Sequence, residues 1–221
     1  MSYKESSFFK DILVNEVFYV AVKSKELVRV ERDGKNVVIA WSDKTMAKTY
    51  LEQEDVDVDK IKRLDVDRFV TYELDDFFTK DEEILMNPTS KNDGEFINIY
   101  KATNELMSDL DNVRVKEFVK DVAKDDLVFG LTNKNQNQFI MISDETHQRP
   151  QIMPVWSIKS RAEKVRNADF EECDLIEVEG EVFGEWLDNL RDDDKAVAID
   201  LKPGVIGTVV SAQKLADQLT F

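Results

Sequence analysis

Two side chains of the sequence offer nucleophile or base chemistry, the single cysteine Cys173 and the single histidine His147. Cys173 lies in the acidic segment Glu171–Asp174, and neighbouring negative charge disfavours the thiolate that a cysteine nucleophile needs. His147 falls in a predicted loop beside Arg149, without an obvious serine or carboxylate partner. The absence of such a partner lowers the odds of nucleophilic catalysis. It does not exclude this chemistry, because a triad can be assembled from distant positions.

The sequence predicts no metal or cofactor site. One histidine and one cysteine cannot build a zinc site, and the seven glycines are too scattered for a phosphate-binding loop. Asp55, Asp57 and Asp59 resemble the start of a calcium loop. However, Lys60 stands where that loop needs glycine and Val66 where it needs glutamate, which favours a solvated acidic loop. Carboxylate pairs are uninformative among 46 acidic residues, so we predict no catalytic residue and no enzyme activity.

Three tryptophans are candidates either for ligand platforms or for core residues. Trp41 and Trp156 each end a short apolar segment and are followed by a serine, Ser42 or Ser157, which we expect to cap a helix. A tryptophan covering such a strand-to-helix turn is more often core, and we favour that interpretation. Trp186 shows helical spacing with apolar neighbours and is also predicted to be core.

Charged segments near these tryptophans have simple interpretations. Asp192–Asp194 lies between a predicted helix and a strand, and is expected to be an exposed turn. The helix after Trp156 carries a basic patch, which either docks on acidic residues of the first half or is solvated; we favour solvation. The patch comprises Lys159, Arg161, Lys164 and Arg166.

The tryptophan segments belong to a repeat that covers the whole chain. Val38–Ser42 followed by Ala47 recurs as Ile152–Ser157 followed by Ala162. The same elements surround each copy, and differences in length fall in loops, as duplicated domains tolerate. The tight Asp-Gly turn of the first copy is replaced by residues 144–151 in the second. Further matches are Phe8 with Phe118, Asp11 with Asp121, Phe18 with Val128, Asp81 with Asp194, and Gly94 with Gly204.

Hydrophobic periodicity predicts an α+β fold in each copy, with a mainly antiparallel sheet flanked by helices. We place the domains at residues 1–111 and 112–221. Asp33-Gly34 is the clearest hairpin signal. In the first copy, strands are expected at 17–22, 27–30, 37–41, 61–66, 84–86 and 96–100, and helices from Ser6 or Ser7, after Ser42, over 69–78 and through Leu106 and Leu110.

The formal net charge of −16 is the strongest compositional fact. Residues 1–111 carry −9 and residues 112–221 carry −7, so the excess is spread over both halves. This disfavours nucleic acid as a ligand and favours a basic protein partner, although acidic charge also simply keeps proteins soluble. No apolar run approaches the ~20 residues of a membrane span. The first five residues lack a signal-peptide core and there is only one cysteine, so a cytoplasmic location is expected.

The second copy resembles a known family, the bacterial domain of unknown function 2750, over residues 115–219. The resemblance rests on Ile152–Ser157 with Ala162, Ile176 and Val178, Trp186, Leu187 and Leu190, and Asp194 with Val197. The first copy matches less well because Val38–Trp41 lacks the proline of the second copy. Its segment 86–89 also resembles the SseB-like family. Neither resemblance implies catalytic residues, but both imply accessory or immunity proteins of bacterial toxin systems by analogy.

These observations lead to a non-enzymatic binding protein as the expected function, and more narrowly to an immunity protein that covers a basic surface of a secreted toxin. No cofactor, nucleic acid or membrane partner is expected, and the contact residues are not predicted. The alternatives are an enzyme or small-ligand sensor with a site between the two copies, and a secretion-accessory or housekeeping protein.

Overall fold

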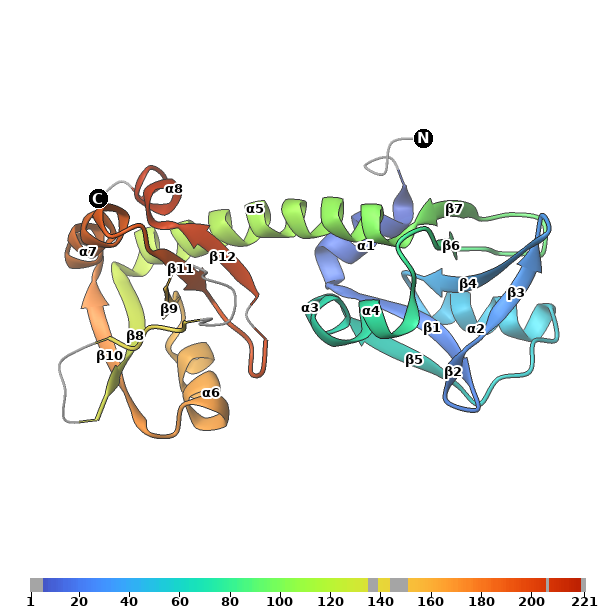
Figure 1. Cartoon of the computed structure of the whole chain (residues 1–221), viewed down its shortest axis with the longest axis horizontal. Helices are drawn as coiled ribbons and strands as arrows, with labels where there is room; N and C mark the ends of the chain where they lie inside the picture. The colour runs from blue at the N-terminus through green and yellow to red at the C-terminus, as the bar shows by residue number, and fades with distance from the viewer. Residues whose placement is uncertain (1–5, 135–138, 144–150, 206, 220–221) are drawn as a thin grey trace. The chain divides into compact units, whose positions relative to one another are not determined.

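The structure is a computed structural model and describes residues 6–134, 139–143, 151–205 and 207–219 (Figure 1). The chain divides into two compact units, Met1–Leu110 and Asp111–Phe221. Each unit has one mixed sheet between helices. The predicted α+β class and the duplication of one domain are therefore confirmed.

The sheet of the first unit has the order β2-β1-β4-β6-β7, with β3 paired to β4 and β5 paired to β1. Its pairs are antiparallel except for β4 with β6. The strands are β1 (Val17–Lys23), β2 (Glu26–Leu27), β3 (Arg29–Arg32), β4 (Lys35–Trp41), β5 (Lys60–Asp65), β6 (Glu83–Met86) and β7 (Glu95–Asn98). The helices are α1 (Ser7–Asn15), α2 (Lys44–Gln53), α3 (Val66–Arg68), the π-helical turn η2 (Phe69–Glu73) and α4 (Leu74–Phe77).

The sheet of the second unit has the order β10-β8-β9-β11-β12. It also contains one parallel pair, β9 with β11, which corresponds to β4 with β6. The strands are β8 (Leu127–Asn133), β9 (Ile152–Trp156), β10 (Cys173–Glu179), β11 (Ala196–Ile199) and β12 (Thr208–Ser211). The helices are α6 (Lys159–Asp169), α7 (Gly180–Asp192) and α8 (Ala212–Ala216).

One helix, α5 (Ile99–Asp125), continues through the boundary between the units (Figure 1). Leu106 and Leu110 pack in the core of the first unit, whereas Phe118 and Val122 pack in the core of the second. The sequence predicted these as the last helix of one copy and the first helix of the next. The two are joined without a break, which the periodicity of either copy alone does not reveal.

Each sheet buries both faces. A single helix, α2 or α6, covers one face, where Trp41 and Trp156 have no exposed surface. The remaining helices of each unit cover the other face. Phe8 and Phe69 lie in that layer of the first unit, and Phe183 lies in that of the second. Strands that are buried on both faces have continuous apolar sequences, and Val37–Trp41 of β4 is an example.

Individual residues explain several turns and element ends in the structure. Asp33 and Gly34 have φ of 51° and 74°, as a tight hairpin turn requires. The helix predicted over 69–78 is instead interrupted by η2. The strand predicted to reach Tyr100 ends at Asn98, because the Asn98 Oδ1 accepts a hydrogen bond from the Lys101 N–H and so starts α5. The replacement for the hairpin turn at 144–151 lies outside the described residues, except for Gln151.

Candidate functional site

Trp41 and Trp156 are core residues in equivalent positions, as predicted. The Trp41 Nε1 donates to the Pro88 carbonyl at 3.0 Å, and the Trp156 Nε1 donates to the Leu201 carbonyl at 3.1 Å. Both acceptors follow the parallel neighbour strand, β6 or β11. Each indole therefore ties two strand ends together and offers no face to a ligand.

The prediction that Ser42 and Ser157 cap the following helices is wrong. Asp43 caps α2, since its Oδ1 accepts from the N–H groups of Thr45 at 2.7 Å and Met46 at 3.1 Å. Ile158 occupies the cap position of α6 without a side-chain bond. Each serine lies one residue before the cap position, and its hydroxyl binds carboxylates instead, Asp11 for Ser42, and Asp121 and Asp200 for Ser157.

We call the resulting clusters the serine corners: Asp11, Ser42 and Asn87 in the first unit, and Asp121, Ser157 and Asp200 in the second. In the first corner the Ser42 N–H donates to the Asn87 Oδ1 at 2.9 Å. The Asn87 Nδ2 donates to the Ser42 Oγ at 3.1 Å, and that hydroxyl donates to the Asp11 Oδ2 at 2.7 Å. Each of these three contacts therefore has its own proton.

The second serine corner has the same backbone contact but different chemistry. The Ser157 N–H donates to the Asp200 Oδ1 at 2.9 Å. The Ser157 Oγ lies 2.9 Å from the Asp200 Oδ2 and 3.2 Å from the Asp121 Oδ2. One hydroxyl proton serves only one of two carboxylates. The Arg161 Nη1 donates to the Asp200 Oδ2 at 2.9 Å and compensates the additional charge.

The serine corners are structural. Ser42 and Ser157 are buried, and their hydroxyls contact carboxylate or amide side chains rather than an imidazole or amine that would take the proton. A buried hydroxyl held between fixed hydrogen-bond partners positions the backbone. We therefore assign the corners to holding the first helix of each unit against the strand ends.

Cys173 is buried at the start of β10. Burial raises the pKa of its thiol, and Asp174 raises that pKa further. The thiol is thus a weak nucleophile, and burial contributes more to this than the acidic neighbours that the sequence suggested. His147 lies outside the described residues.

The acidic segments named from the sequence bind local partners. Asp57 pairs with Lys23 at 2.6 Å, and the Asp59 Oδ2 accepts from the Ser24 N–H at 2.7 Å. Within the described residues, no group of three or more histidine, cysteine or acidic side chains is arranged to hold a metal ion. At the end of α7, Asp193 pairs with Lys195 at 2.7 Å, and Asp194 has φ of 54° in a turn.

Two of the four residues of the basic patch of α6 pair with acidic residues of their own unit. Lys159 pairs with Glu177 of β10, and Arg161 pairs with Asp200. Trp186 is partly buried and packs against Phe139 with ring centroids 4.0 Å apart.

Equivalent grooves open beside α2 and α6, a feature that the sequence did not suggest. The first has a volume of about 490 Å³ and is lined by Tyr50 and Val30 among others. The second has about 180 Å³ and is lined by Val165 and Ile142. Tyr50 and Val165 each lie eight residues after the corner serine. Val30 pairs with Val37 as Ile142 pairs with Ile152, so the grooves occupy the same place in the repeat.

The groove of the first unit has Tyr50 in its lining at the position where the groove of the second unit has Val165. Tyr50 is 3% exposed, and its hydroxyl has no hydrogen-bond partner in the described part of the chain. The rim is fixed because the Arg32 guanidinium donates to the carbonyls of Lys91 and Asp93. Burial raises the pKa of Tyr50, and Glu54 raises it further, so the phenol stays protonated at neutral pH.

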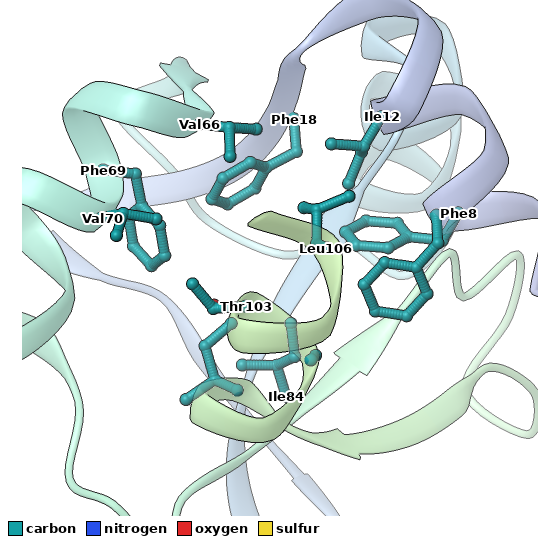
Figure 2. A pocket seen from close by; sticks show the side chains of 12 residues that line it. Phe8, Ile12, Phe18, Val66, Phe69, Val70, Ile84, Thr103 and Leu106 are labelled. Carbon is teal, nitrogen blue, oxygen red and sulfur yellow. The ribbon is translucent and has the colours of Figure 1, made fainter. Parts of the chain in front are cut away.

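Two other hollows lie in the first unit. A cavity of about 20 Å³ lies within the core of the first unit. Figure 2 shows its aromatic walls, with Phe8, Phe18 and Phe69 around Thr103. Such a volume admits about one water molecule, and an apolar cavity of that size stays dry. An open groove of about 670 Å³ follows β7 and the start of α5, with Phe96 and Lys101 in its lining.

The clearest surface feature is the acidic face of α7. Glu181, Glu185, Asp188 and Asp192 recur at spacings of four, three and four residues, so they lie along one side of the helix, and all are exposed. Phe183, Leu187 and Leu190 are buried on the other side. Arg191 is the basic residue within α7, and it pairs with Asp188 and Asp192.

The comparisons with known proteins concern mainly the second unit. A family model described as "Protein of unknown function (DUF2750)" matches residues 115–219, which confirms the resemblance predicted for the second half. The first half lies outside the match, so its kinship with this family and its SseB-like character stay predictions. No curated protein matches the chain.

Among solved structures, a chain described as "Anabaena Tic22 (protein transport)" is similar with a TM-score of 0.24 and 10% identity, over 90% of this chain and 92% of that one. A score this low supports no inference. In the described part of the chain, no helix combines the length and apolarity needed to cross a bilayer.

Proposed function

We propose that this chain is a non-enzymatic binding protein of the bacterial cytoplasm that recognises a basic surface on a protein partner, and more specifically an immunity protein that neutralises a toxin. The observation that carries the proposal is the acidic face of α7. Four carboxylates face solvent along this helix, and two of them, Glu181 and Glu185, have no ion-pair partner among the described residues.

The electrostatics of the whole chain support the proposal. The net charge of −16 is distributed over both halves, so a basic partner is attracted from a distance and associates faster at low salt. The face itself is rigid, since α7 is anchored by Phe183 and Leu187, which have no exposed surface. A fixed row of carboxylates recognises clustered lysine and arginine without first being ordered.

The experiment compares three tagged proteins as baits for the lysate of the source organism, with mass-spectrometric quantification. The first is the natural sequence. The second carries Glu181→Lys, Glu185→Lys and Asp188→Lys. The third is a matched control with the same change in net charge at exposed positions elsewhere, Glu26→Lys, Glu95→Lys and Glu117→Lys. We expect a basic protein that the natural and control proteins capture and the α7 variant does not. Equal capture by all three, or no basic protein in any, contradicts the proposal.

The immunity function has its own test. The natural protein, the α7 variant and the control are each co-expressed with the toxin candidates encoded beside its gene, and cell growth is followed. Growth protection by the natural protein and the control, and its loss in the α7 variant, is the expected result. A basic partner without growth protection would leave the binding function standing and exclude the immunity function.

The groove of the first unit favours a second candidate function, the binding of a small ligand. Its volume lies in the range of ligand pockets, and its lining includes Tyr50, whose hydroxyl has no hydrogen-bond partner in the described part of the chain and could donate to a carbonyl or hydroxyl oxygen of a ligand. The test is a thermal-shift screen with metabolites. A compound that stabilises the natural protein but not Tyr50→Phe supports this function, whereas equal stabilisation of both places the ligand elsewhere.

A further inference from the structure

The edge strands β5 and β10 occupy the same position in the two units and carry opposite charges. Each pairs with the first strand of its unit, β5 with β1 and β10 with β8, and neither pairs with another strand in the described chain. β5 reads Lys-Ile-Lys-Arg-Leu-Asp, and β10 reads Cys-Asp-Leu-Ile-Glu-Val-Glu. One edge is therefore basic and its counterpart acidic.

The registers show which residues direct their backbone groups outward. In antiparallel pairs, alternate residues bond to the neighbour and the others point away. The Val66 N–H donates to the Glu16 carbonyl at 3.1 Å, and the Gly180 N–H donates to the Asp126 carbonyl at 3.2 Å. Counting from these pairs by twos, residues 64 and 62 of β5 and residues 178 and 176 of β10 also bond to the neighbouring strand. The residues between them, 61 and 63 of β5 and 175, 177 and 179 of β10, therefore present their N–H and C=O groups to the open edge.

Arg63 and Glu177 are equivalent positions within these outward sets. Arg63 lies opposite Tyr19 and Glu177 lies opposite Phe129, and these two partners are equivalent in the repeat. An antiparallel pairing of β5 with β10 that places Arg63 opposite Glu177 puts Glu179 diagonal to the guanidinium. The same pairing of β5 with β5, or of β10 with β10, would oppose like charges, which is how natural proteins keep edges apart.

We propose that β5 of one copy of this chain adds to β10 of a second copy as an antiparallel strand, with Arg63 opposite Glu177. Arg63 is exposed and has no hydrogen-bond or ion-pair partner in the described part of the chain. Glu177 is bound by Lys159, but that pair is about half exposed on both sides, so the carboxylate can exchange partners or accept both cations. A contact limited to two strands belongs to the weak, reversible class of interfaces.

The test is sedimentation velocity of the purified full chain between about 10 and about 500 µM, a range that detects weak association. Salt of about 0.15 M limits long-range repulsion between the acidic copies to about 8 Å. We expect concentration-dependent association of the natural protein. Arg63→Glu and Glu177→Arg should each weaken it about tenfold or more, because an opposed pair becomes a like-charged pair. Lys116→Glu and Glu117→Arg, at exposed positions of α5, are the matched controls and should not weaken it.

Mixing separates this pairing from a general charge effect. The Arg63→Glu chain and the Glu177→Arg chain each oppose like charges when they pair with themselves. In a mixture, β5 of the first variant meets β10 of the second, and the two substituted positions again carry opposite charges. Association should therefore return in the mixture.

Two results would overturn the proposal: a natural protein that stays monomeric across the concentration range, or variants that associate as well as their controls. Because no other protein is present, neither result depends on whether α7 binds a basic partner. The strand pairing and the proposed function can therefore fail independently of each other.

Discussion

Asn87 and Asp200 occupy the same position in the two units, and each accepts a hydrogen bond at 2.9 Å from the backbone N–H of a serine. Both residues have a positive φ, 44° and 46°, a conformation that asparagine and aspartate tolerate better than most residues. The difference lies in the second contact. Asn87 gives a proton to the serine hydroxyl, whereas Asp200 has none to give when ionised.

Asn87→Asp is therefore expected to destabilise the first unit. The Ser42 hydroxyl would lie between two carboxylates with one proton, and Met46 stands where the second unit has Arg161. Leaving a part-buried charged contact uncompensated costs about 1–3 kcal/mol. The free energy of unfolding in urea, followed by circular dichroism, measures this change.

The matched substitution is Asp200→Asn in the second unit. It supplies the missing proton but removes the acceptor of Arg161, whose side chain is 49% exposed. Since exposed ion pairs contribute only about 0–1 kcal/mol, the net change should be within about 1 kcal/mol. Equal destabilisation by both substitutions would show that the proton arrangement of the corners is not what distinguishes them.

The buried indoles make a second prediction. Trp41→Phe and Trp156→Phe each remove the donor to a carbonyl, Pro88 or Leu201, and leave space in a fully packed core. We expect a loss of about 2–4 kcal/mol in the free energy of unfolding for each, from the unpaired carbonyl and the cavity together. Trp186→Phe is the control, because this ring is partly exposed and should cost about 1 kcal/mol or less. A control that loses as much as the two buried variants would contradict the proposed role of the carbonyl bonds.

Much of the fold was accessible from the sequence because local signals agree with the tertiary structure. The strand Val37–Trp41 is apolar and β-branched, and Asp33-Gly34 admits the positive φ of its turn. The duplication was visible because Trp41 and Trp156 keep the same spacing to their neighbours. Such signals depend on residues near each other in the chain.

The parts that the sequence did not predict depend on partners distant in the chain. From its sequence neighbours Ser42 is expected to cap a helix, but in the structure its hydroxyl binds Asp11 of the preceding helix. The joining of two helices into α5 depends on the absence of a stop signal rather than on a positive one. The groove beside Tyr50 is formed by segments around residues 30, 50 and 91, whose proximity no spacing rule gives.

The buried thiol of Cys173 leads to predictions about its reactivity and about the pH dependence of stability. Burial raises the pKa of its thiol in the folded chain, so at neutral pH the folded protein holds less thiolate than the unfolded chain does. Labelling by a disulfide reagent at pH 7.5 should be at least about tenfold slower in the native protein than in urea.

The raised pKa stabilises the folded state below the thiol's unfolded pKa, and this contribution is lost as the pH rises through the folded pKa. Cys173→Ser should show a smaller decline in stability on the alkaline side, and an unchanged decline would contradict the assignment.

Tyr50 and Tyr100 form a matched pair of phenols. The Tyr100 hydroxyl donates to the Asp75 Oδ1 at 2.7 Å, and this bond raises its pKa, whereas burial is the first cause for Tyr50. Because the Tyr50 hydroxyl has no protein partner in the described chain, Tyr50→Phe should change the free energy of unfolding by about 0.5 kcal/mol or less. Tyr100→Phe should destabilise the protein measurably, since it loses the contacts to Asp75 and to the Phe78 carbonyl. Alkaline titration of tyrosine absorbance should lose one late-titrating phenol in either variant. A clear loss of stability in Tyr50→Phe would mean that the hydroxyl supports the fold, and the groove would then lose the group that makes it a candidate ligand site.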